Sequence, residues 1–443
     1  MIDATGLARL QFALNIGVHI LFPSITIALG WWLVWFRLRY LRGGDDVWLT
    51  SYQRWTRVFA LSFAVGVVTG VVMSFQFGTN WPNYMNRVGN VAGPFLAYEV
   101  LTAFFLEATF LGVMLYGRGR VPEWLHVAAT VIVAAGTTLS AFWILALNSW
   151  MQTPAGYTFS EGQVIASDWW AAIFNPSFPY RLLHMSIASG VTATFLVAGL
   201  SAWRLLHAPD DAAAARTLRA AVLCAAVLVP LQVFVGDRHG LNTLEHQPAK
   251  IAAIEALWHT RTHAPMVLFA WPNGRTQRND FALEVPDGAS LILRHSRDAK
   301  IQGLDAFAPD IPPVPLVFFA FRVMVGMGIL MWGLSWWGVH ALRGGRSPTR
   351  PLLWAFAGLS FAGWVAVVAG WVVTECGRQP WLVTGLLRTA DAVGYAGEGQ
   401  LTWSLTGYAL TYAMLLISYI VVLTHLAAAP PDARPEPATT HWS

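Results

Sequence analysis

Long apolar runs alternate with short polar connections along almost the whole chain. A helix that crosses a hydrocarbon layer about 30 Å thick needs about 20 mostly apolar residues, and runs of about this length recur throughout. The pattern predicts an all-α integral membrane protein with about nine transmembrane helices. We expect these helices near residues 10–36, 57–76, 95–116, 124–147, 181–203, 219–236, 315–341, 353–374 and 402–427.

Composition agrees with this pattern. Hydrophobic residues make up 56% of the 443 residues and charged residues only 12%, whereas soluble domains carry about 25% charged residues. The 23 Trp and 25 Phe exceed what aromatic belts at the membrane surfaces require, which indicates that flat apolar side chains also line interior surfaces or cofactors. No basic block or nucleic-acid motif occurs, so we expect no nucleic-acid partner. Cys224 and Cys376 predict neither a zinc site nor a disulfide framework.

Arginines are concentrated in the loops after the first, third, fifth and seventh predicted helices. Because positively charged loops face the cytoplasm, we expect the N-terminus outside and the C-terminus in the cytoplasm. The long polar segment 237–314 then lies outside and is a candidate binding surface. The predicted organisation is helices 1–6 over residues 1–236, an external loop over 237–314, helices 7–9 over 315–427 and a disordered cytoplasmic tail over 428–443.

Four side chains that can bind haem iron lie within or at the ends of the predicted helices, namely His19, His184, Met324 and Glu375. Each has an ordinary structural explanation, since a lone intramembrane His is often hydrogen-bonded to a neighbouring helix and Met often fills gaps. Glu375, beside Arg378 and two Trp, could simply mark an anchored helix end. The predicted topology nevertheless puts all four in the outer half of the bilayer, on four helices. This depth matching favours axial ligation of several haems over coincidence.

Two acidic residues lie in the third predicted helix. Glu99 and Glu107 are separated by about 12 Å along an α-helix axis and by about 80° of rotation, so both could line one interior channel. Ion pairing is the alternative, but almost no cation lies at the depth of Glu107. A carboxyl without a partner there would keep its proton because of desolvation, which suits a proton relay. Ser140, Asn148 and Gln152 in the next helix could extend a polar track.

The external loop carries Lys250 and Glu255 at the two ends of a short amphipathic patch. Such a patch could lie at the membrane surface and hold a polar head group through hydrogen bonds while an apolar tail stays in lipid. An ordinary solvated helix face is the alternative, and the residues alone favour it.

Taken together and in order, these motifs resemble subunit I of the cytochrome bd quinol oxidases. Each motif is weak alone, but the ordered set is specific and covers nearly the whole chain. The motifs are Arg9-Leu-Gln-Phe-Ala-Leu before His19, Gln76-Phe-Gly-Thr-Asn-Trp81, Phe104-Phe-Leu-Glu107, Trp150-Met-Gln152, Ala188-Ser-Gly190, Gly236-Asp237, the segment from Lys250 to Glu255, Phe319-Ala-Phe-Arg322-Val-Met324 and Gly377-Arg-Gln-Pro-Trp381.

The resemblance implies an activity and its partners. A protein of this family would be a terminal respiratory oxidase of the bacterial cytoplasmic membrane that oxidises quinol at the outer face and reduces dioxygen to water through three haems. It would generate proton motive force without pumping. It would be embedded in membrane lipid beside a second subunit and a small single-helix accessory subunit.

The resemblance also implies residue roles. His184 and Met324 would be the axial ligands of a low-spin haem b, with Arg322 beside its propionates. His19 and Glu375 would bind two high-spin haems, one a haem b and the other a haem d or a third haem b, and which of them reduces oxygen stays open. The other implied roles are a position between haems for Trp371, haem-side positions for Arg9 and Arg378, the oxygen site and proton route for Glu99 and Glu107, and quinol contacts for Asp237, Lys250 and Glu255.

Two features depart from some relatives. The external loop of about 78 residues is short and resembles the short quinol-loop branch, to which cyanide-insensitive oxidases belong. Arg57 stands where some relatives carry Lys, so a cytoplasmic proton entry near it is not predicted. Two other functions stay open from the residues, a haem-containing quinol electron-transfer subunit without oxygen chemistry and a non-redox ion transporter.

Overall fold

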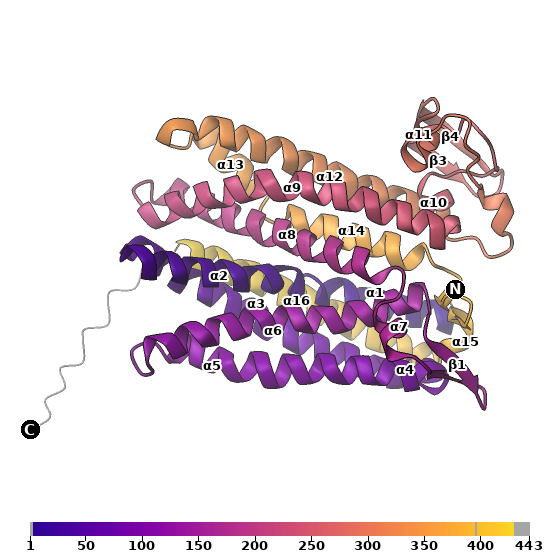
Figure 1. The fold of residues 1–443 in the computed structure, drawn as a ribbon, viewed down its shortest axis with the longest axis horizontal. Helices are drawn as coiled ribbons and strands as arrows, with labels where there is room; N and C mark the ends of the chain where they lie inside the picture. The colour runs from indigo at the N-terminus through magenta and orange to yellow at the C-terminus, as the bar shows by residue number, and fades with distance from the viewer. Residues whose placement is uncertain (1–2, 395–396, 429–443) are drawn as a thin grey trace, which may run out of the picture.

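The computed structural model describes residues 3–394 and 397–428. Within those ranges, nine helical stretches are long and apolar enough to cross a membrane, which confirms the predicted number. Figure 1 shows them side by side along the long axis of the molecule, so that their ends gather at the two ends of a bundle. The disordered tail expected over 428–443 lies outside the described residues, except for its first residue.

Six of the spans are unbroken helices, and each contains the apolar run that predicted it. All are longer than the predicted runs, because a helix can continue past the hydrocarbon into the head-group region and water. They are α3 (Asp46–Thr79), α6 (Glu123–Gln152), α8 (Phe178–His207), α9 (Ala212–His246), α12 (Val314–Ala341) and α16 (Glu398–Ala428).

The other three spans are interrupted. Pro23 has no backbone N–H to donate to the preceding turn, so the first span restarts there as a new helix. Irregular turns inside membrane helices often mark functional sites, and here His19 and Glu107 lie at two of them. The pieces are α1 (Ala4–His19) with α2 (Pro23–Gly43), α4 (Pro82–Leu101) with a π-helix (Thr102–Ala108) and α5 (Thr109–Tyr116), and α13 (Arg350–Gly358) with α14 (Ala362–Cys376).

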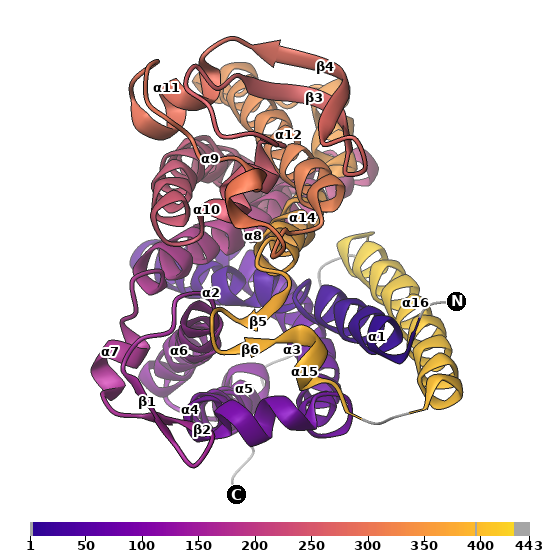
Figure 2. The ribbon, with the colours of Figure 1, turned by 90° about the vertical axis from the view of Figure 1, so that its right-hand side faces the viewer.

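The long connections gather at one end of the bundle, which we call the loop end and which faces the viewer in Figure 2. The chain forms small antiparallel hairpins and short helices there. These are β1 (Tyr157–Ser160) with β2 (Gln163–Ala166), α7 (Trp169–Ile173), α10 (Pro248–Ile254), β3 (Met266–Asn273) with β4 (Arg278–Val285), α11 (Gly288–Arg294), a 3-10 turn (Leu304–Phe307), β5 (Trp381–Val383) with β6 (Leu387–Arg388), and α15 (Thr389–Ala392).

The helix that was expected to end near residue 236 is longer, because α9 continues to His246. Polar residues from Asp237 onward mark the place where the helix leaves the hydrocarbon, whereas the helical backbone itself can continue in water. Asp237 therefore lies on a helix, with an exposed side chain. The segment between α9 and α12 is correspondingly shorter than predicted.

Arginine ion pairs hold the opposite end of the bundle together. Asp211, the N-cap of α9, accepts a hydrogen bond from the backbone N–H of Ala214 at 2.8 Å. Its carboxylate also pairs with Arg54 of α3 at 2.8 Å and with Arg204 of α8 at 3.0 Å. Burial alone would raise the pKa of Asp211, but the Ala214 N–H and the two guanidinium groups together hold it below its usual value. One carboxylate thus joins three helices.

We expect Asp211→Asn to lower the free energy of unfolding by roughly 3 kcal/mol, because breaking a buried ion pair leaves charge uncompensated. A carboxylate with a depressed pKa contributes stability that is complete above its ordinary pKa and is lost as the pH falls through the depressed value. Thermal unfolding in detergent should therefore depend less on acid pH in the variant than in the wild type. The matched control is Asp210→Asn at the exposed neighbouring position, and equal losses in both variants would contradict the assignment.

Candidate functional site

His19 ends α1 and faces α3. Its Nδ1 lies 3.0 Å from the hydroxyl oxygen of Thr69, and a Cβ added to Gly70 would lie 3.0 Å from its Cε1. A partner on one ring nitrogen orients an imidazole and leaves the other nitrogen to bind a metal. Thr69 and the helix break after His19 therefore suit an iron ligand that presents Nε2.

His184 lies six residues into α8 and faces α9. The side-chain nitrogen of Gln232 lies 3.1 Å from its Nε2, and a Cβ added to Gly236 would lie 3.4 Å from its Cε1. The ring of His239 packs against that of His184 with 5.2 Å between centroids. Gln232, Gly236 and His239 lie about one turn apart on α9, so a single face of α9 sets the position of the His184 ring.

Met324 lies ten residues into α12 and faces α14. A Cβ added to Gly370 would lie 3.1 Å from its sulfur. His19, His184 and Met324 therefore each contact a neighbouring helix at a residue without a Cβ. Glycine at these three positions keeps space beside each donor, where a flat porphyrin ring could lie.

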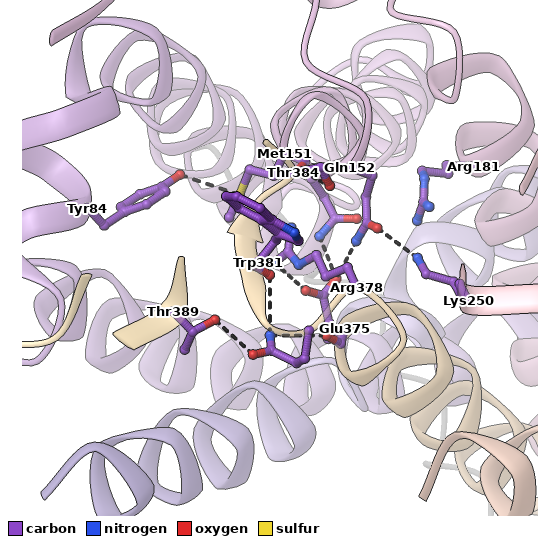
Figure 3. A network of polar contacts seen from close by, with 12 residues as sticks. Tyr84, Met151, Gln152, Arg181, Lys250, Glu375, Arg378, Trp381, Thr384 and Thr389 are labelled. Carbon is purple, nitrogen blue, oxygen red and sulfur yellow. Dashed lines mark hydrogen bonds and ion pairs between the residues drawn. The ribbon is translucent and has the colours of Figure 1, made fainter. Parts of the chain in front are cut away.

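Glu375 lies at the centre of a polar network at the loop end (Figure 3). Its Oε1 accepts hydrogen bonds from Asn148 at 2.8 Å and Gln152 at 3.4 Å, one turn apart on α6, and its Oε2 pairs with Arg378. Asn148 and Gln152, which the sequence suggested as parts of a polar track, thus both contact Glu375. The Glu375 side chain is 27% exposed whereas Arg378 is buried, so part of the carboxylate remains free to bind a metal.

Three of the four candidate donors are staggered in depth, which corrects the expectation of one common level. Glu375 ends α14 at the loop end, and the Met324 sulfur lies beside Gly370, five residues earlier and therefore about 7 Å deeper. Trp364, eleven residues before Glu375, donates its indole N–H to the carbonyl oxygen of Leu21. Eleven residues span about 16 Å along α14. Because His19 is only two residues from Leu21, it lies about 10–15 Å deeper than Glu375. Apolar run length could not fix the relative depths of these residues.

Lys250 is buried, so α10 is not the solvated helix face that the residues alone favoured. Every residue from Lys250 to Ile254 is buried, and the ammonium donates to the side-chain oxygens of Gln152 at 2.7 Å and Gln247 at 2.8 Å. Burial, and then the charge of Arg181, lower the pKa of Lys250 well below its usual value, while Glu375 opposes the shift. Gln152 contacts both Lys250 and Glu375, so it links the segment between α9 and α12 to a candidate iron ligand.

Glu255 follows α10 and faces Arg322 of α12. Their charged groups are 3.8 Å apart, and Arg322 donates its hydrogen bonds to the backbone oxygens of Ile254 and Val267. Burial raises the pKa of Glu255, and Arg322 partly opposes this shift. Arg322 therefore fastens the segment between α9 and α12 to α12, and Glu255 keeps a loosely paired carboxyl that can take up a proton.

Glu99 and Glu107 both face α6. Glu99 accepts a hydrogen bond from Ser140 at 3.3 Å, and a Cβ added to Gly136, one turn away, would lie 2.7 Å from Cγ of Glu107. A π-helical turn holds more residues than an α-helical turn, which reduces the rotation between Glu99 and Glu107. The two acids therefore project closer to the same face than in an unbroken α-helix, where about 80° would separate them. Glu107 is 4% exposed, and its Oε1 has no hydrogen-bond partner in the described part of the chain. The pair is arranged along one face of α6.

Three predicted site residues stand apart from these contacts. Asp237 and Arg9 have exposed side chains on α9 and α1. Among the described residues, no hydrogen bond or ion pair joins Asp237 to Lys250 or Glu255. Trp371 lies one turn before Glu375 on α14 and packs against a hydrophobic cluster between the helices.

Several buried polar residues were missed by the sequence analysis. Arg181 lies one turn before His184 on α8, and Gln247 lies one turn before Lys250, so helical spacing from a candidate residue would have found both. At the end of α3, the side-chain nitrogens of Gln76, Asn80 and Trp81 are buried without a hydrogen-bond partner in the described residues. These three residues belong to a motif that supported the resemblance, but the resemblance implied no role for them.

The residues present fit haem groups. A haem supplies iron for the imidazole, thioether and carboxylate donors, and its carboxylate side chains accept hydrogen bonds. The unsatisfied donors of Gln76, Asn80 and Trp81 lie at and just after the end of α3, the helix that also holds His19 through Thr69. Buried donors in a membrane need acceptors, so the fit extends beyond the iron ligands.

Comparisons with known proteins give one consistent result. Residues 7–431 match the family described as cytochrome bd terminal oxidase subunit I. The chain is 31% identical to cytochrome bd-II ubiquinol oxidase subunit 1 of Escherichia coli, over 98% of each chain, and 33% identical to cytochrome bd ubiquinol oxidase subunit 1 of Bacillus subtilis, over 92% of this chain and 90% of the relative. The solved structure of the bd oxidase from Geobacillus thermodenitrificans superimposes with a TM-score of 0.88 at 29% identity, over 96% of this chain and 98% of that one.

Proposed function

Because the chain belongs to the cytochrome bd terminal oxidase subunit I family, we propose that it oxidises quinol at the outer face of the bacterial inner membrane and reduces dioxygen to water. Membership places it among multi-pass terminal quinol oxidases, which removes the non-redox ion transporter from consideration. The family implies a subunit II partner and haem cofactors. We include a small single-helix accessory subunit in the proposed complex.

The proposed orientation places the loop end outside. Its support is the concentration of arginines, including Arg37, Arg54 and Arg204, at the opposite end, where ion pairs join the helices. Quinol would then approach from the outer leaflet, next to α10 and the start of α12. Protons released from quinol leave on this side.

The proposed ligand set follows the donors described above. His184 and Met324 would hold a low-spin haem b, while His19 and Glu375 would hold two high-spin haems, one a haem b and the other a haem d or a third haem b. When bound, these groups supply the one-electron steps that connect two-electron oxidation of quinol to four-electron reduction of dioxygen. Gln232 and Gly236 orient His184, Thr69 orients His19, and Asn148 with Arg378 orients Glu375.

The external segment would bind the quinol head group. Glu255 is the proposed proton acceptor, because its carboxyl has a raised pKa and only a long contact with Arg322. Buried Lys250 of α10 places a positive charge between this site and Glu375. Gln152 contacts both Lys250 and Glu375 and so connects them. Arg322 holds α10 and β3 against α12, and so fixes the position of Glu255.

Protons for water formation would come from the cytoplasm. Glu107 and Glu99 would carry them along α6 toward the loop end, with Ser140 as hydrogen-bond partner of Glu99. Each dioxygen yields two waters and therefore takes up four protons and four electrons. Because the protons enter from one side and quinol releases its protons on the other, the reaction charges the membrane without a pump.

The observation that carries this proposal most directly is the contact chain from buried Lys250 through Gln152 to Glu375. It connects the external segment to a candidate iron ligand inside one chain. The test is oxygen uptake by the purified complex with a water-soluble quinol, together with its reduced-minus-oxidised spectrum. Haem absorption without quinol-dependent oxygen uptake would favour an electron-transfer subunit instead, and the absence of both would contradict the proposal.

We expect Glu255→Gln to lower kcat for quinol oxidation by about 10²-fold, the usual contribution of a general base. Since burial raises the pKa of Glu255, wild-type activity should rise with pH as this carboxyl loses its proton, and the variant should lack that rise. Steady-state oxygen uptake across pH measures both effects. Glu284→Gln on exposed β4 is the control, and an unchanged pH profile in Glu255→Gln would remove Glu255 from this role.

A further inference from the structure

Two buried cations at the loop end share one neutral acceptor. The side-chain oxygen of Gln247 accepts hydrogen bonds from Lys250 at 2.8 Å and from Arg181 at 3.4 Å. Arg181 is 6% exposed and Lys250 is 3% exposed. Figure 3 shows the ends of both side chains side by side, next to Gln152. Two positive charges therefore lie close together in a region that excludes water.

No carboxylate of the described residues forms an ion pair with these two cations, although Glu375 lies close enough to oppose the pKa shift of Lys250. Arg378 takes the carboxylate of Glu375, and Glu255 faces Arg322. Within residues 3–394 and 397–428, no ion pair joins Arg181 or Lys250 to a carboxylate, and Nε of Arg181 has no hydrogen-bond partner. Amide oxygens satisfy part of the hydrogen bonding but do not neutralise charge. A buried cation pair without carboxylate partners is unfavourable, so bound anions would stabilise it.

The spacing on α8 indicates where those anions belong. Arg181 lies three residues before His184, so both side chains project from the same face of the helix. A haem carries two carboxylate side chains, and this matches the number of unmatched cations. Guanidinium and ammonium groups are the usual partners of carboxylates. A haem bound through His184 would lie next to the helix face that carries Arg181.

We propose that Arg181 and Lys250 form a carboxylate-binding site for the two propionates of the haem held by His184 and Met324. This proposal rests on the haem assignment in the proposed function. It gives Arg181, as a positioning residue, and Lys250 the place beside the propionates that the resemblance implied for Arg322, which donates to backbone oxygens instead. The fixed positive charge favours the form of the haem that has gained an electron, so it raises the midpoint potential. Arg181 therefore both holds this haem and makes it a better acceptor of electrons from quinol.

The test compares Arg181→Gln and Arg181→Lys in the complete complex. Arg181→Gln keeps hydrogen-bond donors for Gln247 but removes the charge, and Arg181→Lys keeps the charge. At a fixed ambient potential we expect the ratio of reduced to oxidised low-spin haem to fall about tenfold in Arg181→Gln, which is about 59 mV for a one-electron couple. Arg181→Lys should stay closer to the wild type. Haem content and spectroelectrochemical titration are the readouts.

Arg37→Gln provides the matched control, because Arg37 is equally buried but lies at the opposite end of the bundle. Loss of the low-spin haem in Arg181→Gln, with its retention in Arg181→Lys and Arg37→Gln, would also support the proposal. An unchanged midpoint in Arg181→Gln would overturn it, as would an equal shift in Arg37→Gln. An unchanged midpoint with a raised KM for quinol would assign the cations to quinol instead. Wild-type spectra and oxygen uptake from the same preparations test the proposed function separately.

Discussion

His184→Ala is expected to abolish quinol oxidation and to remove the absorption of the low-spin haem. Gln232, Gly236 and His239 place the imidazole on one face of α9, and Ala offers no donor atom at this position. Removing a residue that only supports a metal ligand costs about 10–100-fold, so loss of the ligand itself should exceed that range. Optical spectra of the purified complex and oxygen uptake with a soluble quinol measure both losses in one preparation.

His126→Ala is the control for this variant. His126 is another buried histidine, on α6, and it contacts the backbone oxygen of Met114 at 3.2 Å, far from the loop end. It should retain the spectrum and most of the activity, even if the bundle is less stable. An unaltered low-spin spectrum in His184→Ala would refute the ligand assignment.

Glu107→Gln should retain all haems and turn over about 10² to 10⁴ times more slowly, the range expected when an acid–base group is removed. Gln has nearly the same shape as Glu, so it can occupy the space against Gly136 without disturbing α6. It cannot take up and release a proton. The side chain is buried, and one carboxyl oxygen has no hydrogen-bond partner in the described structure, so no ion pair is lost in the substitution.

Stopped-flow reduction by quinol separates this effect from damage to the haems. Reduction of the enzyme without oxygen should be as fast in Glu107→Gln as in the wild type, and only turnover that consumes cytoplasmic protons should slow. Glu284→Gln on exposed β4 should leave both rates unchanged. Normal turnover in Glu107→Gln would remove this residue from the proton route.

The helices could be predicted because hydrocarbon thickness sets a minimum length for an apolar run. What the runs could not reveal was where each helix ends, since water tolerates a helical backbone with polar side chains. This is why α9 extends past Asp237. The turns after His19 and around Glu107 were also missed. Pro23 was a visible signal for the first, whereas no residue pattern marks the π-helix at Thr102–Ala108.

The candidate site was predicted less completely than the helices. Residue chemistry identified His19, His184, Met324 and Glu375, and the structure puts three of them against glycines and the fourth in a polar network. Lys250 was expected near the surface because a lone Lys usually stays in water. Its burial depends on oxygens of Gln152 and Gln247, which come from distant parts of the chain. Such long-range partners cannot be read from local sequence.

The central claim is that these four donors bind three haems in this chain. The most direct test is the haem count per subunit I in the purified complex, made for the wild type and for single Ala variants of His19, His184 and Glu375. Three haems in the wild type and one fewer in each variant is the predicted result. A colourless protein, or variants that keep the full number of haems with unchanged spectra, would contradict the claim.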